Sequence, residues 1–186
     1  MSNKVSLLIA VLLLIPALCI AQTVCAPAKK NKTLQMNPEY SISKNTGSSK
    51  KHSTLMAVIK AADLEEILNY DGPFTVFAPS NIAFSTSTDI DFLLDPTHKK
   101  EVYSLLTHHI VAGNLTASKI LKAMCRGKGI ASFTTVLGNK LIATMNGTDI
   151  VLTDEFGNIA KITNADANQC NGVIHEIDSV FLPNKI

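Results

Sequence analysis

The second half of the chain carries the pattern that most constrains the fold, a series of short β-type runs separated by glycine turns. The runs, with alternating or β-branched residues, occupy residues 131–136, 140–145, 149–153 and 159–163. The turns between them are Gly138-Asn139, Asn146-Gly147 and Gly157-Asn158. Such runs predict consecutive β-hairpins. Asn146-Gly147 is the strongest turn signal, because both residues tolerate the positive φ of a type I′ turn.

The residues before the hairpins have mainly helical spacing. Leu55, Val58 and Ile59 recur at helical intervals after Ser53, which predicts a helix that starts there. Further helices are expected around residues 64–68, 82–84, 99–106 and 120–124, and strands at 74–77, 109–111 and 173–175. Because the helices come mostly first and the hairpins later, we expect an α+β fold rather than alternating α/β.

The N-terminal residues indicate export. An apolar run from Val5 to Ile20 contains Pro16 and precedes Ala21, so residues 1–21 are predicted to be a cleavable signal peptide. A membrane anchor would need about 20 apolar residues, more than this run provides. Acylation of Cys19, as in a lipoprotein, is the third alternative. After cleavage we expect no transmembrane span.

The next residues show no apolar period. Residues 22–51 are rich in Lys, Asn, Ser and Thr, so we expect a flexible linker ahead of a single domain over residues 52–184. A linker of this kind should be removable without loss of the fold.

The charge of the chain points to no class of partner. The chain has a formal net charge of +2 and a single arginine, Arg126, without the dense basic block of a nucleic-acid-binding protein.

The cysteines suggest one bridge, because disulfides persist in an exported chain. We predict a bridge between Cys125 and Cys170, since Cys25 lies in the linker. The alternative is that all three thiols are free, because spacing alone does not determine connectivity.

Three blocks of residues resemble the fasciclin (FAS1) domain in order and spacing. They are Gly72–Phe84, Leu105–Gly113 and Asn171–Asp178, the last followed by Val180, Leu182 and Pro183. The resemblance covers residues 52–183. It implies a β-wedge of antiparallel hairpins flanked by several short helices, and a role in adhesion or matrix interaction. One departure from the family is His108, where a tyrosine often precedes the central histidine.

Several residues in these blocks have structural interpretations. Phe74, Val76 and Phe84 are predicted to be core residues, because strand alternation places the first two on one face. Asn81 is predicted to be a cap or turn residue. Asn171-Gly172 is predicted to be a turn that leads into the last strand.

Two adjacent histidines, His108 and His109, raise the question of a metal site. On a strand, neighbouring side chains point to opposite faces, so the two rings cannot easily share one ion. We expect one ring to be buried and hydrogen-bonded and the other to be exposed. The resemblance selects His109 as the buried ring and leaves His108 at the surface.

No catalytic signature is present in the sequence. It contains no Gly-x-Ser-x-Gly elbow, no Cys-His-Asn signature, no phosphate-binding loop and no clustered acid pair. His175 and Asp178 have no serine or cysteine beside them, and Asp178 is predicted to anchor the final turn. We therefore expect a protein that is not an enzyme and has no cofactor and no metal.

The sequence thus favours a secreted, periplasmic or cell-surface binding module. Its predicted contact surface includes the segment His108–Ser118, with His108, His109, Asn114, Thr116 and Ser118 as binding residues. The expected partners are extracellular or surface proteins, with glycans as a second class, and not nucleic acid. The alternative is an envelope protein that binds a polysaccharide or a small ligand in a cleft, which a pocket with converging polar groups would favour.

Overall fold

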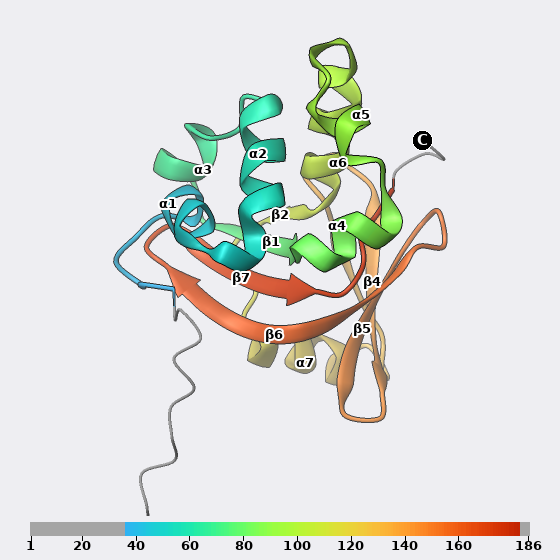
Figure 1. Cartoon of the computed structure of the whole chain (residues 1–186). Helices are drawn as coiled ribbons and strands as arrows, with labels where there is room; N and C mark the ends of the chain where they lie inside the picture. The colour runs from blue at the N-terminus through green and yellow to red at the C-terminus, as the bar shows by residue number, and fades with distance from the viewer. Residues whose placement is uncertain (1–35, 183–186) are drawn as a thin grey trace, which may run out of the picture. The chain divides into compact units, whose positions relative to one another are not determined.

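A computed structural model of the chain describes residues 36–182. The predicted signal peptide, Cys25 and the first part of the predicted linker lie outside the described residues. The described part contains a seven-stranded sheet in the order β2-β1-β7-β6-β5-β4-β3 (Figure 1). The strands are β1 (Phe74–Pro79), β2 (Ile110–Ala112), β3 (Ala131–Thr134), β4 (Lys140–Asn146), β5 (Asp149–Asp154), β6 (Ile159–Gln169) and β7 (Gly172–Ile177).

The predicted series of hairpins is confirmed. Strands β3 to β7 pair antiparallel, each with the next along the chain. The β4–β5 turn differs in detail from the prediction: Asn146 pairs with Asp149, so the turn residues are Gly147 and Thr148. Of these two, only Gly147 has a positive φ, +60°. A glycine at the first turn position is typical of a type II′ turn rather than the predicted type I′ turn.

The sheet is mixed and strongly bent. Strand β1 pairs antiparallel with β2 but parallel with β7, so the implied wedge is not built from antiparallel pairs alone. Strand β6 belongs to both halves of the sheet, and its register against β7 shifts twice, between Ile162 and Ala167. Such irregularities bend a strand. An isolated bridge from Val111 to Thr135 brings the two outer strands, β2 and β3, together.

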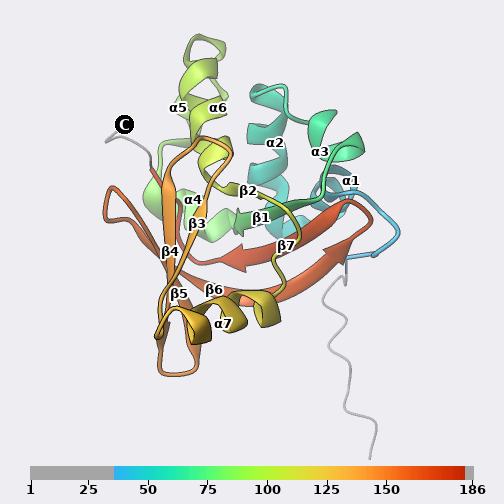
Figure 2. The same cartoon turned by 180° about the vertical axis from the view of Figure 1, so that it is seen from behind.

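The helices lie on two sides of this sheet. They are α1 (Ile42–Ser48), α2 (Ser53–Ala61), α3 (Ile67–Tyr70), α4 (Asn81–Ser87), α5 (Ile90–Leu94), α6 (Lys99–His108) and α7 (Ala117–Arg126), with 3₁₀ turns at Lys50–His52 and Pro96–His98. Helices α1 to α6 lie on one side of β1 and β7, whereas α7 lies on the other side, against β3 and β4 (Figures 1 and 2). The predicted α+β class is confirmed.

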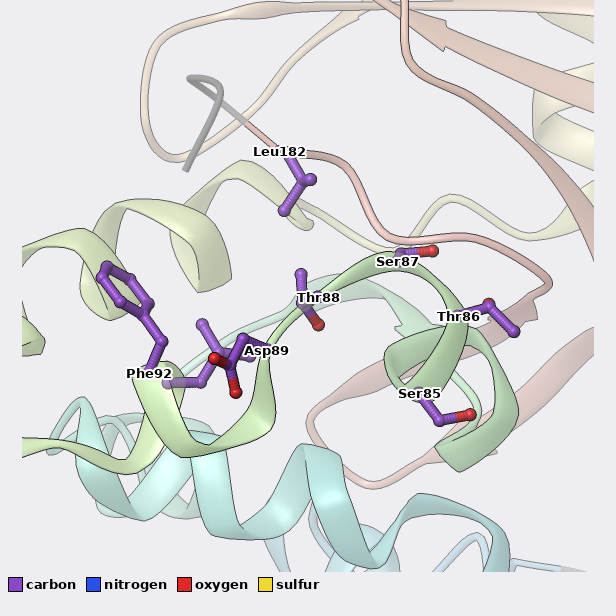
Figure 3. A pocket seen from close by; sticks show the side chains of 8 residues that line it. Ser85, Thr86, Ser87, Thr88, Asp89, Phe92 and Leu182 are labelled. Carbon is purple, nitrogen blue, oxygen red and sulfur yellow. The ribbon is translucent and has the colours of Figure 1, made fainter.

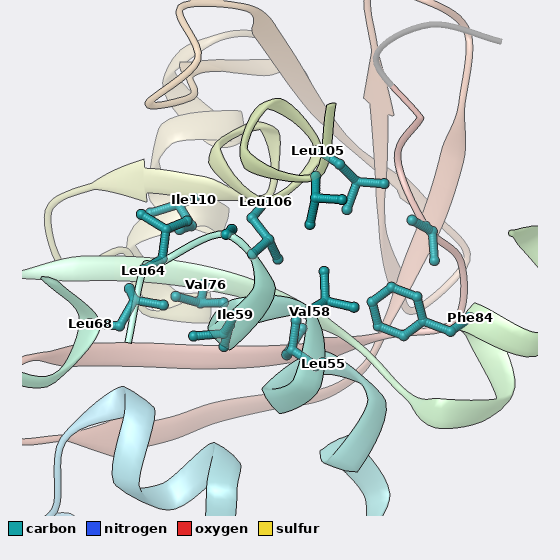
Figure 4. Close-up of a cluster of buried hydrophobic side chains, with 14 of the residues drawn as sticks. Leu55, Val58, Ile59, Leu64, Leu68, Val76, Phe84, Leu105, Leu106 and Ile110 are labelled. Atoms are coloured by element: carbon teal, nitrogen blue, oxygen red, sulfur yellow. The ribbon is translucent and has the colours of Figure 1, made fainter. Parts of the chain in front are cut away.

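Two apolar cores follow from this arrangement. The first lies between α1–α6 and the sheet (Figure 4), and it contains Val76 and Phe84 as predicted, with Phe74 only half-buried at its margin. The second lies between the strands of the wedge and α7, and includes Phe77, Ile120 and Leu141.

Helix α1 shows that the linker prediction is wrong for the residues that the structure describes. Ser41 caps the helix, and Ile42 is completely buried. Asn45 is also buried, and its Nδ2 donates to Asn37 O at 2.7 Å and to the side chain of Gln169 on β6. Amide side chains, rather than a stripe of apolar residues, hold this helix against the sheet. The domain therefore begins before residue 52.

Asn171 and Gly172 join three parts of the molecule. The Asn171 side chain accepts from Ile42 N at 2.9 Å and donates to Leu68 O at 2.9 Å and Asp71 O at 2.8 Å. Gly172 has a φ of +150°, and a Cβ there would lie 1.9 Å from Phe74 O. The predicted turn is thus also the point where the last strand meets β1 and α1.

Asn81 has a similar linking role, whereas the cap of α4 is its neighbour, Ser80. The Asn81 side chain accepts from Thr54 N at 3.0 Å and donates to Lys50 O at 2.9 Å. The backbone groups that it bonds therefore belong to the first turn of α2 and to the 3₁₀ turn before it, far from Asn81 in the sequence.

The predicted Cys125–Cys170 bridge is not formed in the structure, in which both thiols are free and exposed. The first residue of α7, Ala117, contacts Asp166 on β6. Cys125 lies about 12 Å further along the helix axis, at 1.5 Å per residue. Cys170 lies in the β6–β7 turn, where its backbone N–H bonds Tyr40 O. A disulfide requires Cα atoms less than about 7 Å apart.

Candidate functional site

The predicted contact segment His108–Ser118 runs from the end of α6 through β2 to the start of α7, and it has an inner and an outer half. His108 is the last residue of α6, and His109 is its C-cap rather than a strand residue. Both rings are buried. The expectation that His108 lies at the surface is therefore wrong: strand alternation does not apply at a helix end.

His108 forms a buried pair with Asp154. Its Nε2 lies 2.9 Å from Asp154 Oδ2, and both side chains are fully buried. The same carboxylate accepts from Phe156 N at 2.9 Å and from Asn158 N at 2.8 Å. The rings of Phe156 and Phe181 pack against the imidazole. A histidine paired with a carboxylate resembles part of an acid–base set. Here the His108–Asp154 pair links the β5–β6 turn to the end of α6.

His109 connects α6 with the C-terminal end of the described chain. Phe181 N donates to its Nε2 at 3.0 Å, so Nδ1 carries the hydrogen and donates to Leu105 O at 2.8 Å. These two bonds require the neutral ring. Burial lowers the pKa of His109 to about 4, although the bond to Leu105 acts in the opposite direction. The ring is thus a neutral structural connector.

The outer half contains a loop, Gly113–Ala117, that side chains from three strands hold in place. Thr75 Oγ1 on β1 donates to Gly113 O at 2.6 Å and accepts from Leu115 N at 2.8 Å. His175 Nε2 on β7 donates to Leu115 O at 2.7 Å. Asp166 Oδ1 on β6 accepts from Ala117 N at 2.7 Å.

His175 and Asp166 are also bonded to each other. Asp166 N donates to His175 Nδ1 at 3.2 Å, which fixes the neutral tautomer of this ring. Burial lowers the pKa of His175 below its ordinary value. The sequence analysis named His175 without giving it a role. It did not predict a role for Thr75 or Asp166, because the backbone of the Gly113–Ala117 loop, which both side chains bond, is far from them in the sequence.

The structure brings three of the five predicted binding residues together at the surface. Ser118 is exposed, while Asn114 and Thr116 are half-buried. Thr116 caps α7 through Lys119 N, and Lys119 Nζ donates to Asn114 O at 2.7 Å. Asn114 Oδ1 is buried without a hydrogen-bond partner among residues 36–182. His108 and His109 are separated from these three by burial.

A pocket of about 480 Å³ lies elsewhere, between the α4–α5 connection and the C-terminal end of the described chain (Figure 3). Its lining comprises Ser85, Thr86, Ser87, Thr88, Asp89, Phe92, Leu93 and Leu182. Three of the hydroxyls donate to backbone carbonyls of α4: Ser85 and Thr86 to Ile82 O, and Thr88 to Phe84 O. The run of polar residues at 85–89 was the sequence signal for this pocket, and it was not recognised.

Two classes of feature are missing from residues 36–182. No three His, Cys, Asp or Glu side chains are grouped so that they could hold a metal ion. Across the same residues, no helix combines the length and the apolar character needed to cross a membrane.

Comparisons with known proteins agree with this geometry. A model of the fasciclin domain matches residues 50–183. Protein sll1483 of Synechocystis is 36% identical over 137 residues, which cover 70% of this chain and 67% of that protein. Protein sll1735 of Synechocystis is 31% identical over 135 residues, which cover 73% of this chain and 92% of that protein. Human periostin is 27% identical over 149 residues, 78% of this chain but only 16% of periostin.

Among solved structures, a FAS1 domain pair from the insect cell adhesion molecule fasciclin I matches with a TM-score of 0.67. At 17% identity, this match shows the fold alone; it covers 78% of this chain and 51% of the pair. The family model spans most of the chain, including all three blocks of residues that first suggested the resemblance. The chain therefore belongs to the fasciclin domain family.

Proposed function

We propose that the protein is a secreted, periplasmic or cell-surface adhesion module that binds a protein partner through the Gly113–Ala117 loop and the adjoining start of α7. One observation carries the proposal: the loop lies at the surface, yet Thr75, Asp166 and His175 hold its backbone from three different strands. A loop that is already ordered loses less conformational entropy when a partner binds. Membership of the fasciclin domain family, in which one solved structure comes from a cell adhesion molecule, favours the same function by analogy.

The outer side of α7 extends this surface. Ser118, Leu121, Lys122 and Cys125 are all exposed and recur at intervals of three or four residues, so they form one stripe along the helix. Leu121 is 40% exposed and gives the stripe an apolar centre. An apolar centre with a polar rim is the usual composition of a protein–protein contact.

Catalysis is not part of this proposal. The one His–carboxylate ion pair among residues 36–182, His108 and Asp154, has both side chains fully buried and engaged in the packing of the β5–β6 turn. A general base must come within hydrogen-bond reach of a substrate.

The alternative function, polysaccharide binding, receives less support from the pocket beside Leu182. A sugar hydroxyl both donates and accepts. Three of the four lining hydroxyls already use their hydrogens within α4, so the pocket offers mainly acceptors.

Affinity capture from an extract of surface and secreted proteins tests the adhesion proposal. The full chain, the variant Ser118→Arg and the control Ser48→Arg serve as baits; Ser48 is exposed at the end of α1, on the opposite side of β1 and β7 from α7. We expect a protein that the parent chain and the control retain, and that Ser118→Arg retains at least about tenfold less, because a bulky cation at a contact centre disrupts packing. Equal retention by all three baits contradicts the proposed surface. Retention that survives protease treatment of the extract contradicts a protein partner.

Thr75→Val tests whether the order of the loop matters. The substitution removes both hydrogen bonds of Thr75 without touching the outer surface. We expect the captured partner to dissociate several-fold faster, measured by surface plasmon resonance on protein whose circular dichroism shows a folded domain. An unchanged dissociation rate contradicts the role of the ordered loop.

A further inference from the structure

The pocket between the α4–α5 connection and Leu182 has a chemical character that the adhesion surface does not explain (Figure 3). Among residues 36–182, no lysine, arginine or histidine lines it. Its volume, about 480 Å³, lies within the range of small-ligand sites. The polar groups around it are almost all acceptors, and the remaining lining is apolar.

Three of the four lining hydroxyl groups contribute acceptors because their hydrogens are already used. Ser85 Oγ donates to Ile82 O at 2.9 Å, and Thr88 Oγ1 donates to Phe84 O at 3.1 Å. Thr86 Oγ1 lies 3.1 Å from the carbonyl oxygens of Ile82 and Ala83. Each hydroxyl oxygen keeps lone pairs that can accept from a ligand.

The end of α4 adds further acceptors. The carbonyls of its last residues, Ser85–Ser87, receive no hydrogen bond from any group within residues 36–182. Such terminal carbonyls make a helix C-terminus attractive to a cation, and α4 has no basic residue in its last turn.

Asp89 supplies a negative charge beside these acceptors. It is exposed, and its Oδ1 accepts from Asp91 N at 3.0 Å, while Oδ2 has no ion-pair or hydrogen-bond partner among the described residues. The second oxygen therefore remains available to a cation from outside.

The apolar part of the lining comes from Phe92, Leu93 and Leu182. Figure 3 shows Phe92 on one side of Asp89 and Thr88 on the other, with Leu182 above Thr88. An aliphatic stem that ends in a positive charge matches this combination, because the stem is shielded from water while the charge meets the acceptors.

We propose that this pocket binds the side chain of a lysine presented by a protein partner. Lysine fits better than arginine because Oδ1 of Asp89 already accepts from Asp91 N, which leaves one carboxylate oxygen for an ammonium group, whereas a guanidinium prefers a carboxylate with both oxygens free. The inference rests on the proposed function in one respect, namely that the partner presenting the lysine is a protein. The pocket itself is separate from the Gly113–Ala117 loop.

A titration of the full chain with Nα-acetyl-lysine methylamide, followed by ¹H–¹⁵N NMR, tests the pocket without any partner protein. We expect saturable shifts of the amides at residues 85–93. The norleucine analogue, which has the same apolar stem without the charge, should bind at least about tenfold more weakly, as loss of a charged hydrogen bond implies. Glucose should cause no shifts there.

Asp89→Asn and Asp91→Asn form a matched pair of variants on α5. Asparagine caps a helix as well as aspartate does, so Asp89→Asn should keep the melting temperature. We expect Asp89→Asn to weaken lysine binding about tenfold and Asp91→Asn, which lies outside the lining, to change it less than twofold. Lys185 follows Leu182 closely in the sequence, so the titration is repeated with Lys185→Met to remove a competing lysine.

Each contrary result overturns the proposal in a different way. If the norleucine analogue binds as tightly as the lysine compound, the pocket recognises only the apolar stem. If Asp89→Asn and Asp91→Asn weaken lysine binding equally, the effect is an unspecific one of surface charge. Shifts with glucose mean a sugar site. No saturable shift in either the parent chain or Lys185→Met means no site. The two proposals fail separately. Lysine binding together with equal partner capture by the parent chain and Ser118→Arg means failure of the adhesion surface alone. Loss of capture by Ser118→Arg without any saturable lysine binding means failure of the pocket alone.

Discussion

Acid should destabilise the domain through His109, and replacing this residue by glutamine measures the effect. In the folded chain the ring is neutral, because burial holds its pKa at about 4, well below the ordinary value of 6.5. In the unfolded chain the ring gains a proton near its ordinary pKa. Between these two values the unfolded state binds more protons, so the free energy of unfolding falls as the pH falls through this window, and it is retained above it.

The magnitude follows from the two pKa values. Their separation corresponds to about 3 kcal/mol once the pH is below both, and about 2.5 kcal/mol of this is reached at a pH of about 4.5. At neutral pH, His109→Gln should cost about 1–3 kcal/mol, because the substitution disturbs the bonds to Leu105 O and Phe181 N. At a pH of about 4.5, the difference in the free energy of unfolding between the parent chain and His109→Gln should be smaller by about 2.5 kcal/mol.

Urea unfolding of both proteins at the two pH values gives this difference directly. Other histidines with a lowered pKa, His52 and His175, are present in both proteins and cancel in the comparison. Thr46→Val serves as the control, since it removes a buried hydrogen bond to Ile42 O but no titratable group. If the cost of His109→Gln is the same at both pH values, the ring is not the proton-linked group that its burial implies.

Three further substitutions or measurements test the packing. Ile42→Ala should lower the free energy of unfolding by about 3 kcal/mol in urea, because Ile42 is completely buried under α1; a surface linker would lose almost nothing. Gly172→Ala should prevent accumulation of folded protein, since its Cβ would overlap the β1 backbone, whereas Gly138→Ala, also at positive φ but in open space, should cost only about 1 kcal/mol. Cys125 and Cys170 should both react with a thiol reagent in the folded protein, and a linked peptide in non-reducing mapping would refute the structure at this point.

Local signals in the sequence predicted most of the elements. The turns around Gly138, Gly147 and Gly157 separate strands that the structure also contains, because turn geometry depends on neighbouring residues. The helices at residues 53–61 and 117–126 have apolar residues at helical spacing, so their buried faces were visible in the sequence.

The features that the sequence did not predict share one physical cause, which is contact between residues far apart in the chain. Helix α1 has little apolar periodicity, and it is held by amide groups such as Gln169, far along the chain. The burial of His108 depends on Asp154 in the β5–β6 turn. The contact loop was predicted as a segment, but the side chains that fix it, including Asp166, come from other strands. The lysine pocket also combines residues 85–93 with Leu182. No local pattern specifies such pairs.

The parallel pairing of β1 with β7 has a consequence for how the chain folds. Phe74 pairs with Gly172, so this part of the sheet forms only when almost the whole chain has been synthesised. Until then, the apolar strand β1 can pair with β2 but lacks its second neighbour. Pairings between residues so far apart in sequence close large loops and slow the folding reaction. A nascent or truncated chain that ends before β7 therefore exposes an open strand edge, and should depend on chaperones or associate with other chains through that edge.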